Sequence, residues 1–221
     1  MKRKHAMVFR ISITASGSFL ANGVPGIGLF HYNRQIHTFD FISLDANNEN
    51  QQDAIRIYDM MYDHKDRLIL CLTSGIYIFN EETHQLELLK LQDKVNLENV
   101  REILQDKTGD YWFVVGSNGI YHYSPDRGQW KHYVNQLDNP NSLPDNSIFC
   151  LLEDHDGYIW IGMQNRGLSR LNPKDGSFLN FEHQKIQSRT LPDNNVNDLY
   201  EDPSHFLWVA TENGLARMNP E

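Results

Sequence analysis

The stretch that decides the fold is Leu143-Pro-Asp-Asn-Ser-Ile-Phe-Cys-Leu-Leu-Glu-Asp-His-Asp-Gly-Tyr-Ile-Trp160-Ile-Gly, followed by Asn165-Arg-Gly-Leu-Ser-Arg-Leu-Asn-Pro173. The pattern returns at Leu191-Pro-Asp-Asn-Asn-Val-Asn-Asp-Leu-Tyr-Glu-Asp-Pro-Ser-His-Phe-Leu-Trp208-Val-Ala and continues to Pro220. A third copy contains Trp112, and the three tryptophans are spaced 48 residues apart. Two weaker copies precede it, with Leu20 and Ile69 at the tryptophan position. Self-similarity at a nearly fixed period indicates an array of one supersecondary unit.

Each copy is predicted to consist of short strands separated by turn residues. In the last copy the strands are expected at 196–201, 206–211 and 215–218. A fourth strand is expected in the earlier copies, at 35–41, 85–91, 129–133 and 177–181. Gly, Asn-Pro and Lys-Asp-Gly occupy the gaps, and no long stretch shows helical periodicity with caps.

This pattern predicts an all-β fold, a β-propeller of about five four-stranded blades within a single domain spanning 1–221. The propeller is expected to be incomplete, because the last blade lacks its outer strand. The blades are predicted at 8–41, 55–91, 95–133, 143–181 and 191–220.

Three repeated positions have a predicted structural role. The tryptophans Trp112, Trp160 and Trp208 share one register, so they are interpreted as packing between blades and not as a sugar-stacking ladder. A glycine before the third strand permits a positive φ or a close backbone approach. In successive copies this glycine is Gly75, Gly119, Gly167 and Gly214. The Asp that ends the first strand is expected to accept hydrogen bonds from N–H groups of the turn.

Composition and charge exclude several classes of protein. The chain has 221 residues with 20 basic and 29 acidic side chains, a net charge of −9. This acidity argues against binding to duplex nucleic acid or to an anionic membrane. The longest apolar run, 68–72, is far shorter than the ~20 residues of a membrane helix. The chain begins with basic residues, but the segment after them alternates apolar with polar residues and includes Arg10. The start of the chain is therefore a poor match to a signal peptide.

The sequence contains no recognised catalytic or metal-binding motif, so we predict no enzyme, no cofactor and no metal site. The two cysteines, Cys71 and Cys150, lack metal-type spacing. The segment 154–157 lacks the further ligands of a calcium loop and is interpreted as a turn. His64, His155 and His205 are interpreted as solvated residues at the same turn position of separate blades, and not as one metal cluster.

The loops that enter each first strand and that join the second and third strands are rich in polar side chains. Amides, carboxylates and a guanidinium suit the paired hydroxyls of a sugar. The alternative is that such side chains satisfy the backbone of their own turns. The candidate ligand-binding residues are Asn118, Asn146, Gln164, Asn165, Arg166, Asn194, Asn195, Glu212 and Asn213. Arg166 is the one least explained by the repeat.

Together, Asn-x-Val/Ile, Glu-Asp, x-Gly-x-Ile-Trp-Ile-Gly and Gly-Leu-x-Arg-Leu-Asn-Pro resemble the two-component regulator propeller repeat. The resemblance is close at 143–181 and 191–220 and holds in outline at 55–91 and 95–133. It implies the periplasmic sensor region of hybrid two-component histidine kinases, whose seven-bladed propellers respond to oligosaccharides. With five copies, the chain is interpreted as a fragment or truncated relative of such a sensor; a closed five-bladed ring would need residues 1–7 as an outer strand.

The expected function is therefore non-catalytic ligand sensing in the periplasm, with an oligosaccharide as ligand. One alternative is a protein–protein interaction scaffold, since propeller faces also bind polypeptides. Another is a propeller lyase, which needs a histidine and an acidic group that converge at the axis. Open blade faces and edges favour homo-oligomers.

Overall fold

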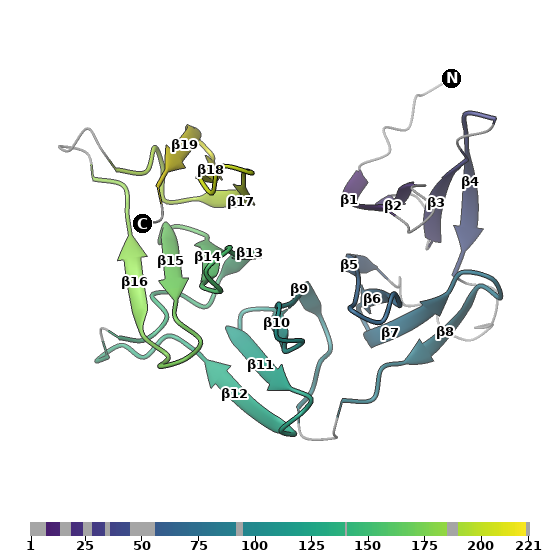
Figure 1. Ribbon diagram of the computed structural model, residues 1–221, viewed down its shortest axis with the longest axis horizontal. Helices are drawn as coiled ribbons and strands as arrows, with labels where there is room; N and C mark the ends of the chain where they lie inside the picture. Colours follow the sequence, from purple (N-terminus) through teal and green to yellow (C-terminus); the bar gives the residue numbers. More distant parts are fainter. Residues whose placement is uncertain are drawn as a thin grey trace. The chain divides into compact units, whose positions relative to one another are not determined.

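The computed structural model describes residues 8–13, 19–23, 28–33, 36–44, 56–91, 95–139, 141–184 and 190–219. The regular secondary structure of these residues is entirely β-strand (Figure 1). In the described part of the chain, no helix is long and apolar enough to cross a lipid bilayer. The sequence predictions for residues 1–7 and for the start of the strand expected at 35–41 lie outside the described residues.

The strands form five antiparallel sheets, here called blades 1 to 5, and in each blade the strands follow one another in chain order. Blade 1 contains β1 (Val8–Ile13), β2 (Phe19–Gly23), β3 (Gly28–Asn33) and β4 (Thr38–Ser43). Blade 2 contains β5 (Ile57–Tyr62), β6 (Leu68–Leu72), β7 (Gly75–Asn80) and β8 (Gln85–Leu88). Blade 3 contains β9 (Val100–Gln105), β10 (Tyr111–Val115), β11 (Ile120–Ser124) and β12 (Gln129–Tyr133). Blade 4 contains β13 (Ile148–Glu153), β14 (Ile159–Met163), β15 (Leu168–Leu171) and β16 (Phe178–Phe181). Blade 5 contains β17 (Val196–Glu201), β18 (Leu207–Thr211) and β19 (Gly214–Met218).

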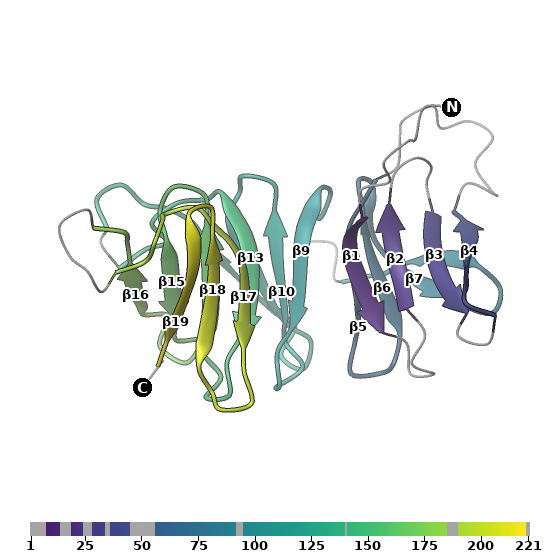
Figure 2. The same cartoon turned by 90° about the horizontal axis from the view of Figure 1, so that it is seen from above.

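The chain divides into two compact units, residues 1–103 and 104–221, and the division falls within β9. Within the first unit β1 lies beside β5, and within the second β13 lies beside β17 (Figure 2). In these two pairs of successive blades the first strands are thus neighbours, as expected for stacked meanders. The predicted all-β fold of propeller-type blades is confirmed, and the described part of the last blade has three strands.

The second strands of blades 2, 3 and 4 have no solvent-exposed face. β6, β10 and β14 are continuous apolar runs in which every residue is buried. The outer strands β8, β12 and β16 are mostly exposed and contain both polar and apolar residues. A run without alternation is the sequence pattern of a strand with no solvent face.

The apolar cores of the second unit lie between consecutive blades. In one core, Trp112 and Ile120 of blade 3 pack with Ile161 of blade 4. In the next, Trp160 of blade 4 packs with Val196 and other residues of blade 5. Trp112 and Trp160 have no exposed surface, whereas Trp208, in the last described blade, is partly exposed. Each buried tryptophan therefore owes its cover to the blade that follows it.

The turn after the first strand is organised by one aspartate. In blade 4, Asp154 Oδ1 accepts the N–H groups of Asp156 and Tyr158 at 3.0 and 2.9 Å. Its Oδ2 accepts the indole N–H of Trp160 at 2.6 Å. The predicted turn bonds are present, and the indole bond is an addition that the sequence analysis missed. It ties the blade's largest side chain to its own turn.

The same bond recurs in the neighbouring copies and is replaced where tryptophan is absent. Indole N–H groups donate to Asp106 and Asp202 at 2.8 Å in blades 3 and 5. In blade 2, Ile69 has no side-chain N–H group, and the Arg67 guanidinium contacts Asp63 Oδ2 instead, at 2.8 and 2.6 Å. Burial acts to raise the pKa of Asp63, but the hydrogen bonds from Arg67 and the turn outweigh it and leave the pKa lowered.

Two of the repeated glycines are fixed by a close backbone approach. Gly119 and Gly167 have φ of +77° and +68°. A Cβ atom at these positions would lie 2.3 Å from Tyr133 O and 2.2 Å from Phe181 O. A side chain is excluded both by the left-handed backbone and by the outer strand of the same blade.

Candidate ligand-binding face

Each blade has two ends, which we call the loop end and the turn end. The loop end carries the connection from the second to the third strand and the chain that enters the first strand. The turn end carries the Asp turn and the connection from the third to the outer strand. Because the strands are antiparallel, these connections alternate between ends. All of the sequence-predicted ligand-binding residues belong to the loop end of blades 3, 4 and 5.

The loop ends of blades 4 and 5 are joined through Asn195. The backbone N–H of Asn165, in the β14–β15 loop, donates to Asn195 Oδ1 at 2.9 Å. The Asn195 Nδ2 group donates to Glu212 Oε2, in the β18–β19 loop, at 2.8 Å. Beside it, Asn213 Nδ2 donates to Asp193 Oδ2 at 2.6 Å. Three loops of two blades therefore share one hydrogen-bond network.

The carboxylate of Asp193 is held in its charged form. The backbone N–H of Asn195 and the side-chain amide of Asn213 together lower the pKa of Asp193. Both hydrogen bonds are donated to the ionised oxygens, so they favour the anion over the protonated acid. The loop end of blade 5 thus presents fixed negative charge.

Five of the predicted residues that belong to this network or lie beside it are exposed. Gln164, Asn165 and Arg166 are exposed in the β14–β15 loop, and Glu212 and Asn213 are exposed in the β18–β19 loop. Asn165 has a φ of +66°, a conformation that asparagine tolerates better than most residues. The Arg166 guanidinium lies 3.8 Å from Glu182 Oε1, with more than half of its side chain exposed. Its donors remain accessible to a ligand.

Asn146 and Asn194 occupy a different position, inside the corner that leads from one blade to the next. Asn146 Oδ1 accepts the backbone N–H of Asn135 at 2.7 Å, and Asn194 Oδ1 accepts that of His183 at 2.6 Å. These oxygens satisfy loop backbone, the alternative that the sequence left open for every polar loop residue. Asn118 is exposed in the β10–β11 loop, and its carbonyl oxygen lies 2.7 Å from His132 Nε2. Among the described residues, no recorded hydrogen bond links Asn118 to blade 4 or blade 5.

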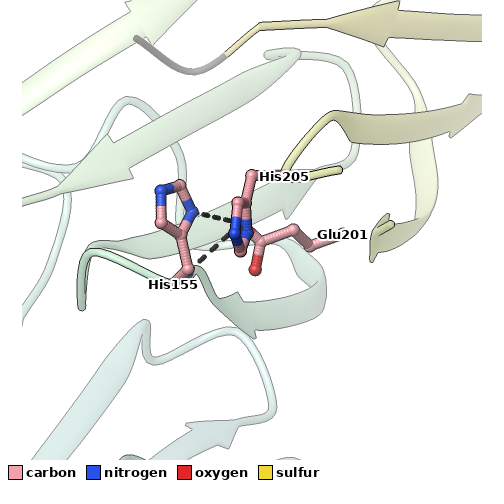
Figure 3. Close-up of side chains that lie close together, drawn as sticks. All are labelled: His155, Glu201 and His205. Atoms are coloured by element: carbon pink, nitrogen blue, oxygen red, sulfur yellow. Dashed lines mark hydrogen bonds and ion pairs between the residues drawn. The ribbon is translucent and has the colours of Figure 1, made fainter. Parts of the chain in front are cut away.

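The turn end holds a cluster that the sequence analysis did not expect. The imidazoles of His155 and His205 stack with ring centroids 3.9 Å apart, and both face Glu201 (Figure 3). The interpretation of these histidines as separate turn residues is therefore wrong. His155 directly follows the turn Asp, whereas His205 comes two positions later, where blades 3 and 4 have Gly109 and Gly157. Aligning the turns from the Asp onward would have revealed the difference.

A second group of ionisable residues is buried in blade 3. His122 Nε2 lies 3.0 Å from Asp110 Oδ2, and the His122 ring stacks on Trp112 with centroids 4.0 Å apart. Burial lowers the pKa of His122, although the negative charges of Asp110 and Asp106 act to raise it. Burial thus favours the neutral form of this histidine.

Repeated antiparallel meanders, stacked through tryptophans on their second strands, define a β-propeller. The family model described as two component regulator propeller matches residues 142–165 and 190–213. The two matched segments contain the first and second strands of blades 4 and 5, and they are similar to this repeat, as the sequence predicted. No curated protein matches the chain at a significant level.

Solved structures share the fold. The extracellular domain of the hybrid two-component system BT3049 from B. thetaiotaomicron is 21% identical, with a TM-score of 0.74 over 97% of this chain and 28% of that one. The corresponding domain of BT4673 from the same organism is 24% identical, with a TM-score of 0.72 over 100% of this chain and 27% of that one. Virginiamycin B lyase from Staphylococcus aureus is 15% identical, with a TM-score of 0.66 over 96% of this chain and 67% of that one. The chain spans less than a third of the length of either two-component domain.

Proposed function

We propose that the chain is a non-catalytic, ligand-binding part of a two-component sensor, that it acts in the periplasm, and that its ligands are oligosaccharides. The observation that carries the proposal is the loop end of blades 4 and 5, where a network anchored by Asn195 leaves amide, carboxylate and guanidinium groups accessible. Sugars expose adjacent hydroxyls that both donate and accept, and such a mixed set of groups complements them. The fold shared with extracellular domains of two-component systems supports the sensor role and the location.

The test is calorimetric titration of the chain with a panel of oligosaccharides. We expect at least one to bind, and we expect Arg166→Ala to weaken that binding roughly tenfold, the value of one hydrogen bond to a charged group. Arg127→Ala is the matched control, because Arg127 is exposed between β11 and β12 at the turn end. Equal losses in both variants, or a panel without any binder, would contradict the proposal. Capture of a protein partner that sugars do not affect would favour the scaffold alternative.

A second candidate, a propeller lyase, is favoured only by the fold shared with virginiamycin B lyase. Incubating the chain with quinupristin, the compound in another structure of that enzyme, tests it directly. We expect no turnover, and turnover would overturn the non-catalytic assignment.

We also propose that the chain self-associates. Among the described strands of blade 5, β19 lies at the edge of its sheet, and Leu215 on it is 60% exposed. A groove of about 640 Å³ beside β19 is lined by residues that include Phe181, Leu191 and Met218. An unpaired edge next to apolar surface is a site for strand addition. Light scattering would give a mass above that of the monomer.

A further inference from the structure

The Asp turns of blades 4 and 5 are alike in backbone but differ in the residue at the left-handed position. Gly157 N–H donates to Asp154 O at 3.0 Å, and His205 N–H donates to Asp202 O at 2.8 Å. Gly157 has a φ of +84°, and His205 has a φ of +64°. Glycine adopts this conformation without strain, whereas histidine adopts it at an energetic cost. Blade 5 thus retains a histidine where glycine would be more stable.

The strained position directs the His205 side chain toward blade 4. Its imidazole stacks on that of His155, with an interplanar angle of 26°. Glu201, at the end of β17, lies beside both rings. Its Oε1 atom is 2.5 Å from His155 Nδ1 and 3.6 Å from His205 Nδ1 (Figure 3).

Glu201 is also fixed by the backbone. Its Oε1 atom accepts the N–H of His155 at 3.2 Å, so the carboxylate bridges the turns of the two blades. Blades 3 and 4 contain the equivalent bond, from Lys107 N–H to Glu153 Oε2 at 2.8 Å. That pair of blades has Lys107 and Gly157 at the positions of His155 and His205. The carboxylate bridge therefore belongs to the repeat, whereas the two histidines that face Glu201 are particular to blades 4 and 5.

The ligand atoms of His155, Glu201 and His205 all lie within 4.8 Å of one another. A tetrahedral zinc ion with bonds of about 2.0–2.1 Å holds its ligands about 3.3 Å apart. The two Nδ1-to-Oε1 distances, 2.5 and 3.6 Å, lie on either side of that value. Side-chain movements of less than about 1 Å would make the two distances equal.

The donor set and its exposure select the class of ion. Imidazole nitrogens suit zinc, nickel and copper, whereas calcium and magnesium prefer oxygen ligands. His155 and Glu201 are half-buried and His205 is exposed, so an ion reaches the group from solvent and keeps water in its remaining positions.

We propose that His155, Glu201 and His205 bind one divalent transition-metal ion of the zinc class, which links the turns of blades 4 and 5. The site lies at the turn end, opposite the proposed ligand-binding loops, and is independent of the proposed function. Its role is to join two blades that the repeat otherwise joins through a carboxylate bridge and apolar packing.

The test is calorimetric titration of the tag-free chain with zinc chloride alone. We expect one zinc ion per chain for the wild type. His205→Gly removes a ligand and places the residue of blades 3 and 4 at the left-handed position, so this variant is expected to fold at least as well as the wild type. We expect its zinc affinity to fall at least tenfold, and that of Glu201→Gln to fall similarly.

His64→Ala is the control, since His64 directly follows the turn Asp of blade 2 and lies outside the group. It should leave zinc affinity unchanged. A second readout is the thermal midpoint, which zinc should raise in the wild type and in His64→Ala but not in His205→Gly. A wild type that binds no zinc, or a His205→Gly variant that binds as tightly as the wild type, would overturn the proposal.

Discussion

Replacing Asp154 by alanine tests the physical account of the blade most directly. The substitution removes the acceptor of the Trp160 indole N–H and of two turn N–H groups. Trp160 has no exposed surface, so its N–H group would be left buried without that partner. We expect a large loss of stability without loss of the propeller fold, because the apolar faces of the blade are unchanged.

The magnitude follows from these bonds. A buried donor left unsatisfied costs about 1–3 kcal/mol, and each turn bond contributes about 0.5–1.5 kcal/mol. The free energy of unfolding should therefore fall by about 2–6 kcal/mol in Asp154→Ala. Trp160→Phe removes the indole N–H but keeps a ring. Together the two substitutions should cost less than the sum of their separate effects, by about 1–2 kcal/mol, because they delete the same bond.

These differences in the free energy of unfolding are measured by urea unfolding, monitored by far-ultraviolet circular dichroism. Asp126→Ala is the control, because Asp126 is exposed in the connection between β11 and β12, also at the turn end. Its effect should stay within about 0.5 kcal/mol, as at other surface positions. The reasoning is refuted if Asp154→Ala loses less than about 1 kcal/mol or if the Asp154 and Trp160 effects are strictly additive.

Two further predictions concern a buried base and a glycine. Burial lowers the pKa of His122, so the unfolded chain binds a proton before the folded chain as the pH falls. The free energy of unfolding should therefore decline below about pH 6.5. The urea midpoint of His122→Asn should fall less steeply with pH than that of the wild type. Equal slopes in the two proteins would contradict this reasoning. Gly167→Ala should lose about 2–4 kcal/mol, because its Cβ atom would lie 2.2 Å from Phe181 O. Gly176→Ala, also at positive φ but with nothing within 4 Å, should lose only about 1 kcal/mol; equal losses would refute the close-approach argument.

The sequence by itself determined the repeat, and the repeat determined the blades. Continuous apolar runs such as β14 have no solvent face, so a period of about 48 residues required sheets that cover one another. The carboxylate that follows the first strand of blades 2 to 5 and the glycine before the third strand were also readable, because both act on their own chain within a few residues.

Tertiary structure alone decided which of the polar residues meet. Asn165, Asn195 and Glu212 are up to 47 residues apart and form one network only because blades 4 and 5 stack at their loop ends. The same stacking brings His155 to His205 at the turn end, although they are 50 positions apart in the chain. A turn residue looks solvated when its own blade is considered alone, and its partner is supplied by the next blade. Hydrogen bonds and imidazole contacts act over a few ångströms, so they depend on the distance between blades and not on the spacing along the sequence.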